Sequence, residues 1–60
     1  MQIEVGKNYQ NRQGDNVLIV DSFIAHDRRF YYDDHGRSYY PDGVPTSEGV
    51  GSGFRLVGEV

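Results

Sequence analysis

Acidic and histidine side chains gather in the middle of this chain, where they offer ligands for a divalent metal ion. The potential ligands are three consecutive residues and three that precede them: Asp33, Asp34 and His35, then Asp21, His26 and Asp27. Carboxylate oxygens and imidazole nitrogens bind zinc and calcium in proteins. Their spacing here matches neither a His-x-x-x-His pair on a helix nor an EF-hand loop. We therefore interpret Asp33 as a residue that caps a turn, and we predict no metal site.

No group of residues identifies a catalytic reaction. The serines, at positions 22, 38, 47 and 52, lack the sequence context of a nucleophile on a strained turn. The glycine-rich segment at 49–53 (GVGSG) is followed by Phe54-Arg55-Leu56 rather than by the Lys-Ser or Lys-Thr pair of a phosphate-binding loop. We predict that the chain is not an enzyme and needs no cofactor.

Tyrosine and arginine residues indicate a binding function more strongly than any other feature. Arginine and tyrosine are enriched at the energetically dominant positions of protein–protein interfaces, and this chain has five tyrosines in 60 residues. We predict a protein-binding surface that consists of Tyr31, Tyr39, Arg28, Arg29 and Arg37. The partner is another protein or a second copy of this chain, because so small a domain has little core of its own.

Binding of single-stranded nucleic acid is the alternative function, since the aromatic faces of small β-barrels stack on bases. Six basic and nine acidic residues give the chain a net charge of −3. Four of the carboxylates lie in the same region as the arginines: Asp27, Asp33, Asp34 and Asp42. Affinity for nucleic acid depends on uncompensated cations that displace counterions from the phosphates. The charge pattern therefore favours a protein partner.

The residues predicted to bind lie on or beside a hairpin at 29–43 (RFYYDDHGRSYYPDG). Asp33 and Gly36 suit the first and fourth positions of a type I turn that ends in a left-handed glycine. Such a turn is the usual three-residue loop of a bulged hairpin. It sets four cross-strand pairs: Asp33 with Arg37, Tyr32 with Ser38, Tyr31 with Tyr39, and Phe30 with Tyr40.

Alternation along these strands divides their side chains between two faces. The two sets are Tyr31, Tyr39, Arg29 and Asp33 on one face, and Phe30, Tyr32 and Tyr40 on the other. The charged members of the first set indicate that its face is exposed to solvent. We therefore predict that Tyr31 and Tyr39 point outward and that Phe30 and its neighbours lie against the core.

A second hairpin precedes this one. Residues 11–14 (NRQG) repeat the spacing of an Asx residue, two others and a glycine. This spacing places Tyr9 opposite Val17 and Asn8 opposite Leu18. Residues 17–20 (VLIV) form the only continuous aliphatic run, which is typical of a strand covered on both faces.

These elements together predict an all-β fold. We expect strands near residues 3–11, 15–23, 29–33, 37–41 and 54–59, with a polar connection at 24–28. Glycine and proline interrupt every window that could form a helix. Short strands joined by tight turns predict a small five-stranded SH3-like barrel of antiparallel hairpins. The chain, 1–60, is expected to form a single domain in which the glycine-rich segment at 44–53 is a flexible loop.

The composition is typical of a soluble intracellular protein. No apolar run approaches the about 20 residues that a membrane-spanning helix needs, and the first ten residues lack the features of a signal peptide. The chain contains no cysteine, which fits a reducing compartment. We predict a cytoplasmic location and no membrane association.

Several short motifs of the chain resemble those of small proteins encoded by tailed phages and prophages. The matching residues, in chain order, are Tyr9, Arg12, Gly14, the run at 17–20, Asp34-His35-Gly36-Arg37, Tyr39-Tyr40, Asp42-Gly43 and Leu56-Val57-Gly58-Glu59-Val60. In that family a Tyr…Arg-x-Gly opening, an Asp-Gly-Arg-x-Tyr middle and a Leu-Val-x-Glu ending recur, whereas here His35 stands between Asp34 and Gly36. The resemblance implies an accessory protein that binds a host protein in the host cytoplasm, with inhibition of that protein as one outcome.

Overall fold

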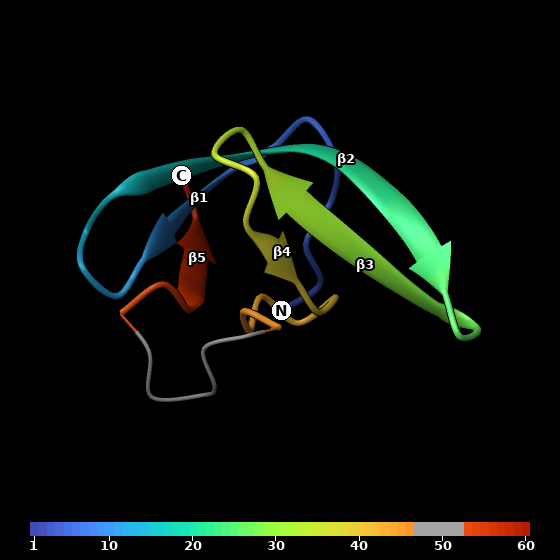
Figure 1. The fold of residues 1–60 in the computed structure, drawn as a ribbon. Coiled ribbons are helices and arrows are strands. Elements are labelled where there is room, and N and C mark those ends of the chain that lie inside the picture. Colours follow the sequence, from blue (N-terminus) through green and yellow to red (C-terminus); the bar gives the residue numbers. More distant parts are fainter. Residues whose placement is uncertain (47–52) are drawn as a thin grey trace.

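The computed structural model describes residues 1–46 and 53–60, which form five strands and no helix (Figure 1). The predicted all-β fold is therefore confirmed. Since the described residues form no helix, none of them provides an apolar helix that could cross a bilayer. The strands are β1 (Asn8–Asn11), β2 (Asn16–Ala25), β3 (Arg28–Asp33), β4 (Ser38–Tyr39) and β5 (Leu56–Glu59).

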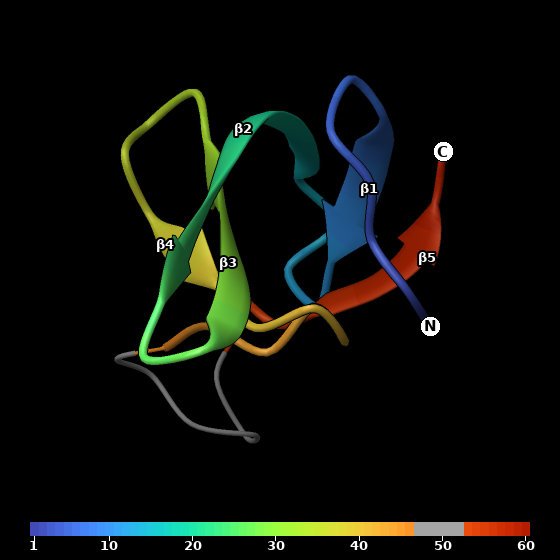
Figure 2. The same ribbon diagram turned by 90° about the vertical axis from the view of Figure 1, so that its right-hand side faces the viewer.

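The strands form one antiparallel sheet in the order β4-β3-β2-β1-β5. The first part of β2 pairs with β1 and the remainder pairs with β3, with an irregularity in register between Ile19 and Asp21. Figure 2 shows the result: β1 and β5 lie on one side of the molecule and β3 and β4 on the other, with β2 curving between them. A bulge at such a position bends a strand and increases its twist.

The sheet is open between β4 and β5, so the predicted barrel and SH3-like fold are not confirmed. A strand was predicted near residues 37–41. Instead β4 has two residues, and the chain turns at residues 40–44 and returns beside β4. There Pro45 forms a bridge with Tyr39, and the Thr46 N–H donates to the Ser38 carbonyl at 3.0 Å.

Three turns share one hydrogen-bonding pattern, at residues 11–15, 33–37 and 40–44. In each turn the N–H of the first residue donates to the carbonyl of the fifth residue, and the N–H of the fourth residue donates to the carbonyl of the first. The donor–acceptor distances are 2.8–3.1 Å. The fourth residue is always a glycine, with φ between 85° and 93°, a conformation that other residues rarely adopt. Both predicted hairpin turns are therefore confirmed. So are their registers: Tyr9 with Val17, Asn8 with Leu18, Tyr31 with Tyr39, and Tyr32 with Ser38.

The predicted polar connection at 24–28 is wrong, because β2 and β3 continue to a loop of two residues. His26 and Asp27 both have positive φ, 53° and 62°, as a type I′ turn requires. The sequence hides this turn, since its usual residues are Asn-Gly or Asp-Gly. The N-terminal strand, predicted at 3–11, is shorter in the structure. Gly6 has a φ of 88°, which is not an extended conformation, and β1 begins only at Asn8.

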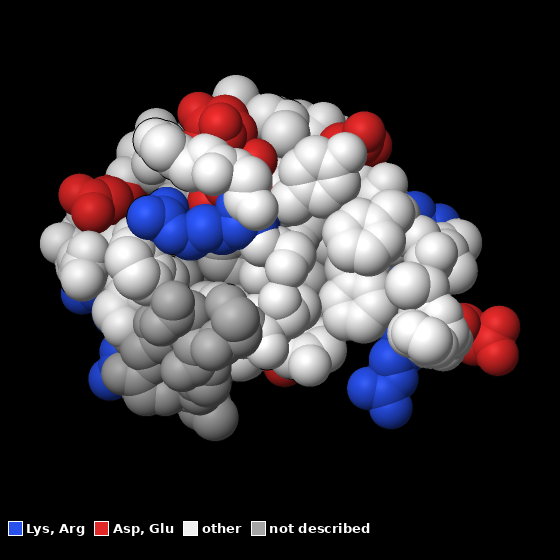
Figure 3. Space-filling model, viewed as in Figure 1, with Lys and Arg blue, Asp and Glu red and all other residues white. Residues whose placement is uncertain are grey.

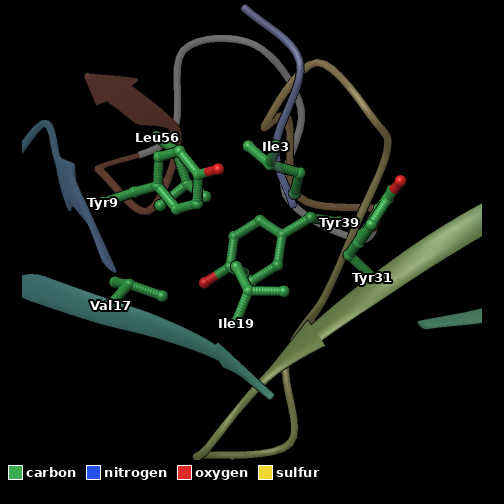
Figure 4. Packing of buried hydrophobic residues seen from close by; sticks show 7 residues of the cluster. All are labelled: Ile3, Tyr9, Val17, Ile19, Tyr31, Tyr39 and Leu56. Atoms are coloured by element: carbon green, nitrogen blue, oxygen red, sulfur yellow. The ribbon is translucent and has the colours of Figure 1, made fainter. Parts of the chain in front are cut away.

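The core lies between the two parts of the sheet (Figure 4). Its buried apolar residues come from every part of the chain: Ile3, Tyr9, Val17, Ile19, Tyr31, Tyr39 and Leu56. The N-terminal segment covers the core, and the Ile3 N–H donates to the Pro41 carbonyl at 2.9 Å. The run at 17–20 is not covered on both faces as predicted, because Val20 is 42% exposed whereas Ile19 is 0% exposed.

The predicted assignment of the hairpin faces is wrong. Tyr31 and Tyr39 are 7% and 0% exposed, whereas Phe30 is only half-buried. Asp33 belongs to the inner face although it is charged, because its carboxylate accepts hydrogen bonds there from the turn and from Tyr39. A buried charge is tolerated when it is hydrogen-bonded in this way.

The structure describes only residues 44–46 and 53 of the predicted flexible loop at 44–53. Residues 44–46 run beside β4, as described above. Residues 47–52 lie outside the described residues.

We expect Asp27→Gly to stabilise the protein. A left-handed conformation costs a residue with a Cβ about 1–2 kcal/mol, and the greater freedom of glycine in the unfolded chain offsets about 0.5–1 kcal/mol of that relief. The free energy of unfolding should therefore rise by about 0.5–1 kcal/mol, measured by urea denaturation. The matched control is Asp27→Ala, which removes the same side chain but keeps the Cβ. Equal effects of the two substitutions would contradict a strained turn.

Candidate functional site

Four aromatic side chains lie next to one another on the outer face of β2, β3 and β4. We call this surface the aromatic strip: Phe23, Phe30, Tyr32 and Tyr40. The ring centroid of Phe23 lies 5.4 Å from that of Phe30 and 5.8 Å from that of Tyr32. The ring centroid of Phe30 lies 5.6 Å from that of Tyr40. Figure 3 shows ring-shaped side chains side by side on the face in view, with charged residues mainly around them.

The register of the two hairpins explains why these rings meet. Phe23 pairs with Phe30 across β2 and β3, and side chains of directly paired residues share a face. Tyr32 lies two residues beyond Phe30 on the same strand, so it lies on the same face. Tyr40 follows Tyr39, which points inward, and is therefore directed outward. The strip therefore depends on the positions of two turns, the two-residue loop at His26–Asp27 and the turn at 33–37.

A carboxylate lies at one end of the aromatic strip. The Tyr32 hydroxyl donates to Asp21 Oδ2 at 3.2 Å, and the Ser22 N–H donates to Asp21 Oδ1 at 2.8 Å. The hydrogen bond to Asp21, with its negative charge, raises the pKa of Tyr32 above the usual value. This end of the strip is therefore acidic and hydrogen-bonded rather than cationic.

The structure does not bring the predicted arginines together. Arg28 pairs with Ala25 beside the His26–Asp27 loop, at the end of the hairpin. Arg29 donates from Nη1 to Ser22 Oγ at 2.9 Å. Arg37 lies at the opposite end of β3, with its guanidinium carbon 4.1 Å from the centroid of the Phe54 ring. Tyr31 and Tyr39 are buried, so the five predicted binding residues do not form one surface.

Asp33 has a structural role that occupies both of its carboxylate oxygens. Oδ1 accepts the N–H groups of His35 and Arg37, both at 2.9 Å. Oδ2 accepts the Tyr39 hydroxyl at 2.8 Å and lies 3.8 Å from Arg37 Nη1. Burial, together with this hydrogen bond to Asp33, raises the pKa of Tyr39 well above its usual value. The interpretation of Asp33 as the residue that caps the turn is confirmed.

The three consecutive candidate metal ligands do lie close together. Ligand atoms of Asp33, Asp34 and His35 lie within 4.8 Å of one another, and His35 Nδ1 lies 3.0 Å from Asp34 Oδ1. A metal ion at this place would compete with the hydrogen bonds that Asp33 accepts from the turn and from Tyr39. Loss of those bonds would leave buried groups unsatisfied. The absence of a metal site stays a prediction.

A groove of about 360 Å³ lies between the first turn and the turn at 33–37. Asn11, Asn16, His35 and Arg37 are among the residues that line it. The Asn11 side chain is engaged with its own turn, where Oδ1 accepts the N–H groups of Gln13 and Asp15 at 3.0 and 2.9 Å. Among residues 1–46 and 53–60, those that line the groove carry no hydroxyl or thiol group.

Sequence reasoning missed Phe23 as a surface residue. It was placed at the end of a strand covered on both faces, yet Phe23 is 42% exposed. The sequence offers little signal for this position, because the His26–Asp27 turn that pairs Phe23 with Phe30 lacks the usual Asn-Gly or Asp-Gly residues.

We expect Tyr39→Phe to destabilise the protein by about 1–3 kcal/mol, because Asp33 Oδ2 loses a donor in a buried site. Urea denaturation measures this change. Tyr40→Phe is the matched control, since Tyr40 is only half-buried and no hydrogen bond of its hydroxyl is seen among the described residues. Equal stability of the two variants would show that the Tyr39–Asp33 bond contributes little.

The raised pKa of Tyr39 predicts a loss of stability in alkali. Above about pH 10 Tyr39 loses its proton in the unfolded chain but keeps it in the folded one. The unfolded state then binds fewer protons, so the free energy of unfolding falls by about 1.4 kcal/mol per pH unit from this residue. Below pH 10 its contribution is fully present. Urea denaturation between pH 8 and about pH 11 measures the slope. Tyr39→Phe should reduce it, and an unchanged slope would assign the alkaline loss to other groups.

Comparison with known proteins reveals no relative of this chain. No protein-family model, no curated protein and no solved structure matches the chain. The resemblance to phage and prophage proteins therefore stays a prediction from short motifs.

Proposed function

We propose that this chain is a non-catalytic protein-binding module, and that the aromatic strip is its contact surface. The observation that carries the proposal is the outward packing of Phe23, Phe30, Tyr32 and Tyr40 against one another. A domain of this size normally uses its aromatic residues to build a core. Here the buried core contains three aromatic residues, Tyr9, Tyr31 and Tyr39, and the four rings of the strip lie outside it.

Aromatic side chains suit such a surface for physical reasons. They bury a large area on binding and lose few rotatable bonds. The strip is also pre-ordered, because neighbouring rings hold one another and Asp21 holds the Tyr32 hydroxyl. Pre-ordered side chains reduce the entropy that association costs.

Single-stranded nucleic acid is the second candidate, because bases also stack on aromatic rings. Such binding needs cations along the path of the phosphates. Arg28 lies on the same face as the strip, but Arg29 points to Ser22 on the opposite face. Arg37 lies beside Asp33 and Phe54, and Lys7 lies 3.4 Å from Glu59 and 3.7 Å from Glu4. A protein partner is favoured for this reason.

We also propose a barrel-like, SH3-like arrangement of the sheet. Support comes from the bend of β2, which is shared by two parts of the sheet that enclose one core. We further propose a phage or prophage origin, a host-protein partner and a cytoplasmic location. Their support is the set of short motifs and the composition described above.

Removal of rings from the strip should weaken partner binding without unfolding the protein. We expect Phe23→Ala combined with Tyr40→Ala to weaken the affinity for a captured partner at least about tenfold, as loss of interface hot spots does. The measurements are capture from a bacterial lysate, identification of the retained protein, and titration of that purified protein with each variant.

Two controls complete the experiment. Val57→Ala removes another exposed apolar side chain, far along the sheet on β5, and should leave binding unchanged. Tyr31→Ala should lower the free energy of unfolding by about 3–5 kcal/mol, as removal of a buried aromatic ring does. A partner that binds the strip variant as well as the wild type would refute the proposal. Tight binding of a single-stranded oligonucleotide at physiological salt, lost in the strip variant, would establish the second candidate instead.

A further inference from the structure

The second half of β2 has one open edge. Residues Asn16 to Leu18 of β2 pair with β1. At Ile19 the carbonyl accepts the Gly6 N–H, and the N–H donates to the Lys7 carbonyl. Beyond Ile19, β2 has β3 on one side and no strand of residues 1–46 or 53–60 on the other (Figure 1). An open strand edge presents N–H and C=O groups that can pair with another strand.

The register shows which backbone groups lie at this edge. Ala25 and Arg28 flank a two-residue loop and are therefore a hydrogen-bonded pair. Pairs alternate along an antiparallel ladder, so Phe23 also bonds to β3, whereas Ser22 and Ile24 direct their N–H and C=O groups outward. The side chains beside this edge are apolar and exposed: Phe23 is 42% and Ile24 66% exposed.

We infer that this edge of β2 pairs, antiparallel, with the same edge of a second copy of the chain. The inference does not rest on the proposed function, because it concerns a strand edge and not the face of the strip. A two-fold axis at Phe23 places Ser22 opposite Ile24 of the second copy, so that their backbone groups form a hydrogen-bonded pair. Phe23 then lies directly opposite Phe23 of the second copy, at the closely spaced type of position where aromatic pairs are favourable.

Charge complementarity favours pairing with a second copy of the chain in this antiparallel register. In the same register Asp21 faces Ala25 of the second copy, whose neighbour on the same face is Arg28. Ala25 is small, so the carboxylate and the guanidinium can meet across it. The two-fold axis makes this pair twice. Asp21 now accepts the Ser22 N–H, and pairing would transfer that N–H to Ile24 of the second copy and release Asp21 to Arg28.

Such a dimer would join the two aromatic strips. Both strips lie on the same side of the combined sheet, because the two-fold axis runs perpendicular to it. The rings would then continue from Tyr40 of one copy through both phenylalanine pairs to Tyr40 of the other. This arrangement also gives the projecting end of the hairpin a neighbour, which a two-stranded ribbon needs for stability in water.

Sedimentation velocity across a wide range of protein concentrations tests the inference. We expect the wild type to dimerise reversibly. Ile24→Pro removes an N–H that faces away from β3, so it should weaken dimerisation at least about tenfold while the hairpin stays folded. Ile24→Ser is the matched control, because it removes the apolar side chain and keeps the N–H. A thermal melt checks folding of each variant.

Charge reversal provides a test that does not depend on Ile24. Asp21→Arg and Arg28→Asp each place like charges at both pairs of their own dimer, so each variant alone should be monomeric. A mixture of the two variants restores one native and one reversed pair and should form heterodimers. Wild type that stays monomeric, equal dimerisation of Ile24→Pro and Ile24→Ser, or a mixture without heterodimers would each overturn the inference. Tyr40→Ala separates the two proposals, since it belongs to the strip but lies away from the edge and should leave dimerisation unchanged.

Discussion

The buried carboxylate of Asp33 is the group on which the central hairpin depends. One oxygen closes the turn by accepting two backbone N–H groups, and the other holds the Tyr39 hydroxyl in the core. A buried polar group is stable only when it is hydrogen-bonded, and here donor and acceptor satisfy each other. Because Asp33 and Tyr39 lie on the same side of their strands, this contact satisfies the polar groups of that face and allows it to be the inner one.

That decision has a consequence for the surface. Once Tyr31 and Tyr39 are inside, alternation along β3 and β4 sends Phe30, Tyr32 and Tyr40 outside. The core therefore contains tyrosines, whose hydroxyls have polar partners. The Glu4 N–H donates to the Tyr9 hydroxyl at 2.8 Å, as Tyr39 donates to Asp33. The outer face keeps the phenylalanines, which have no polar group that needs a partner.

The bend of β2 links the core to both proposed contacts. It lets one strand pair with two parts of the sheet, which together enclose seven buried apolar residues among those that the structure describes. It also carries the second half of β2 away from β1, which leaves an edge open and turns Phe23 outward. A small domain thus gains its core and its exposed edge from the same feature. Asp21 lies just after the irregularity and holds the first outward N–H of that edge.

Local chemistry alone determined the turns, the two predicted registers and the all-β class. An Asx residue followed three positions later by glycine closes a turn through its own backbone, so the cross-strand pairs follow without reference to the rest of the chain. The faces of the hairpin, the I′ turn at His26 and Asp27, and the open edge of β2 were decided by tertiary structure. Both faces of the hairpin carry aromatic rings, so composition does not distinguish them. The hydrogen bond from Tyr39 to Asp33 forms within the hairpin, but only packing against β1, β2 and the N-terminal segment buries the face that carries it.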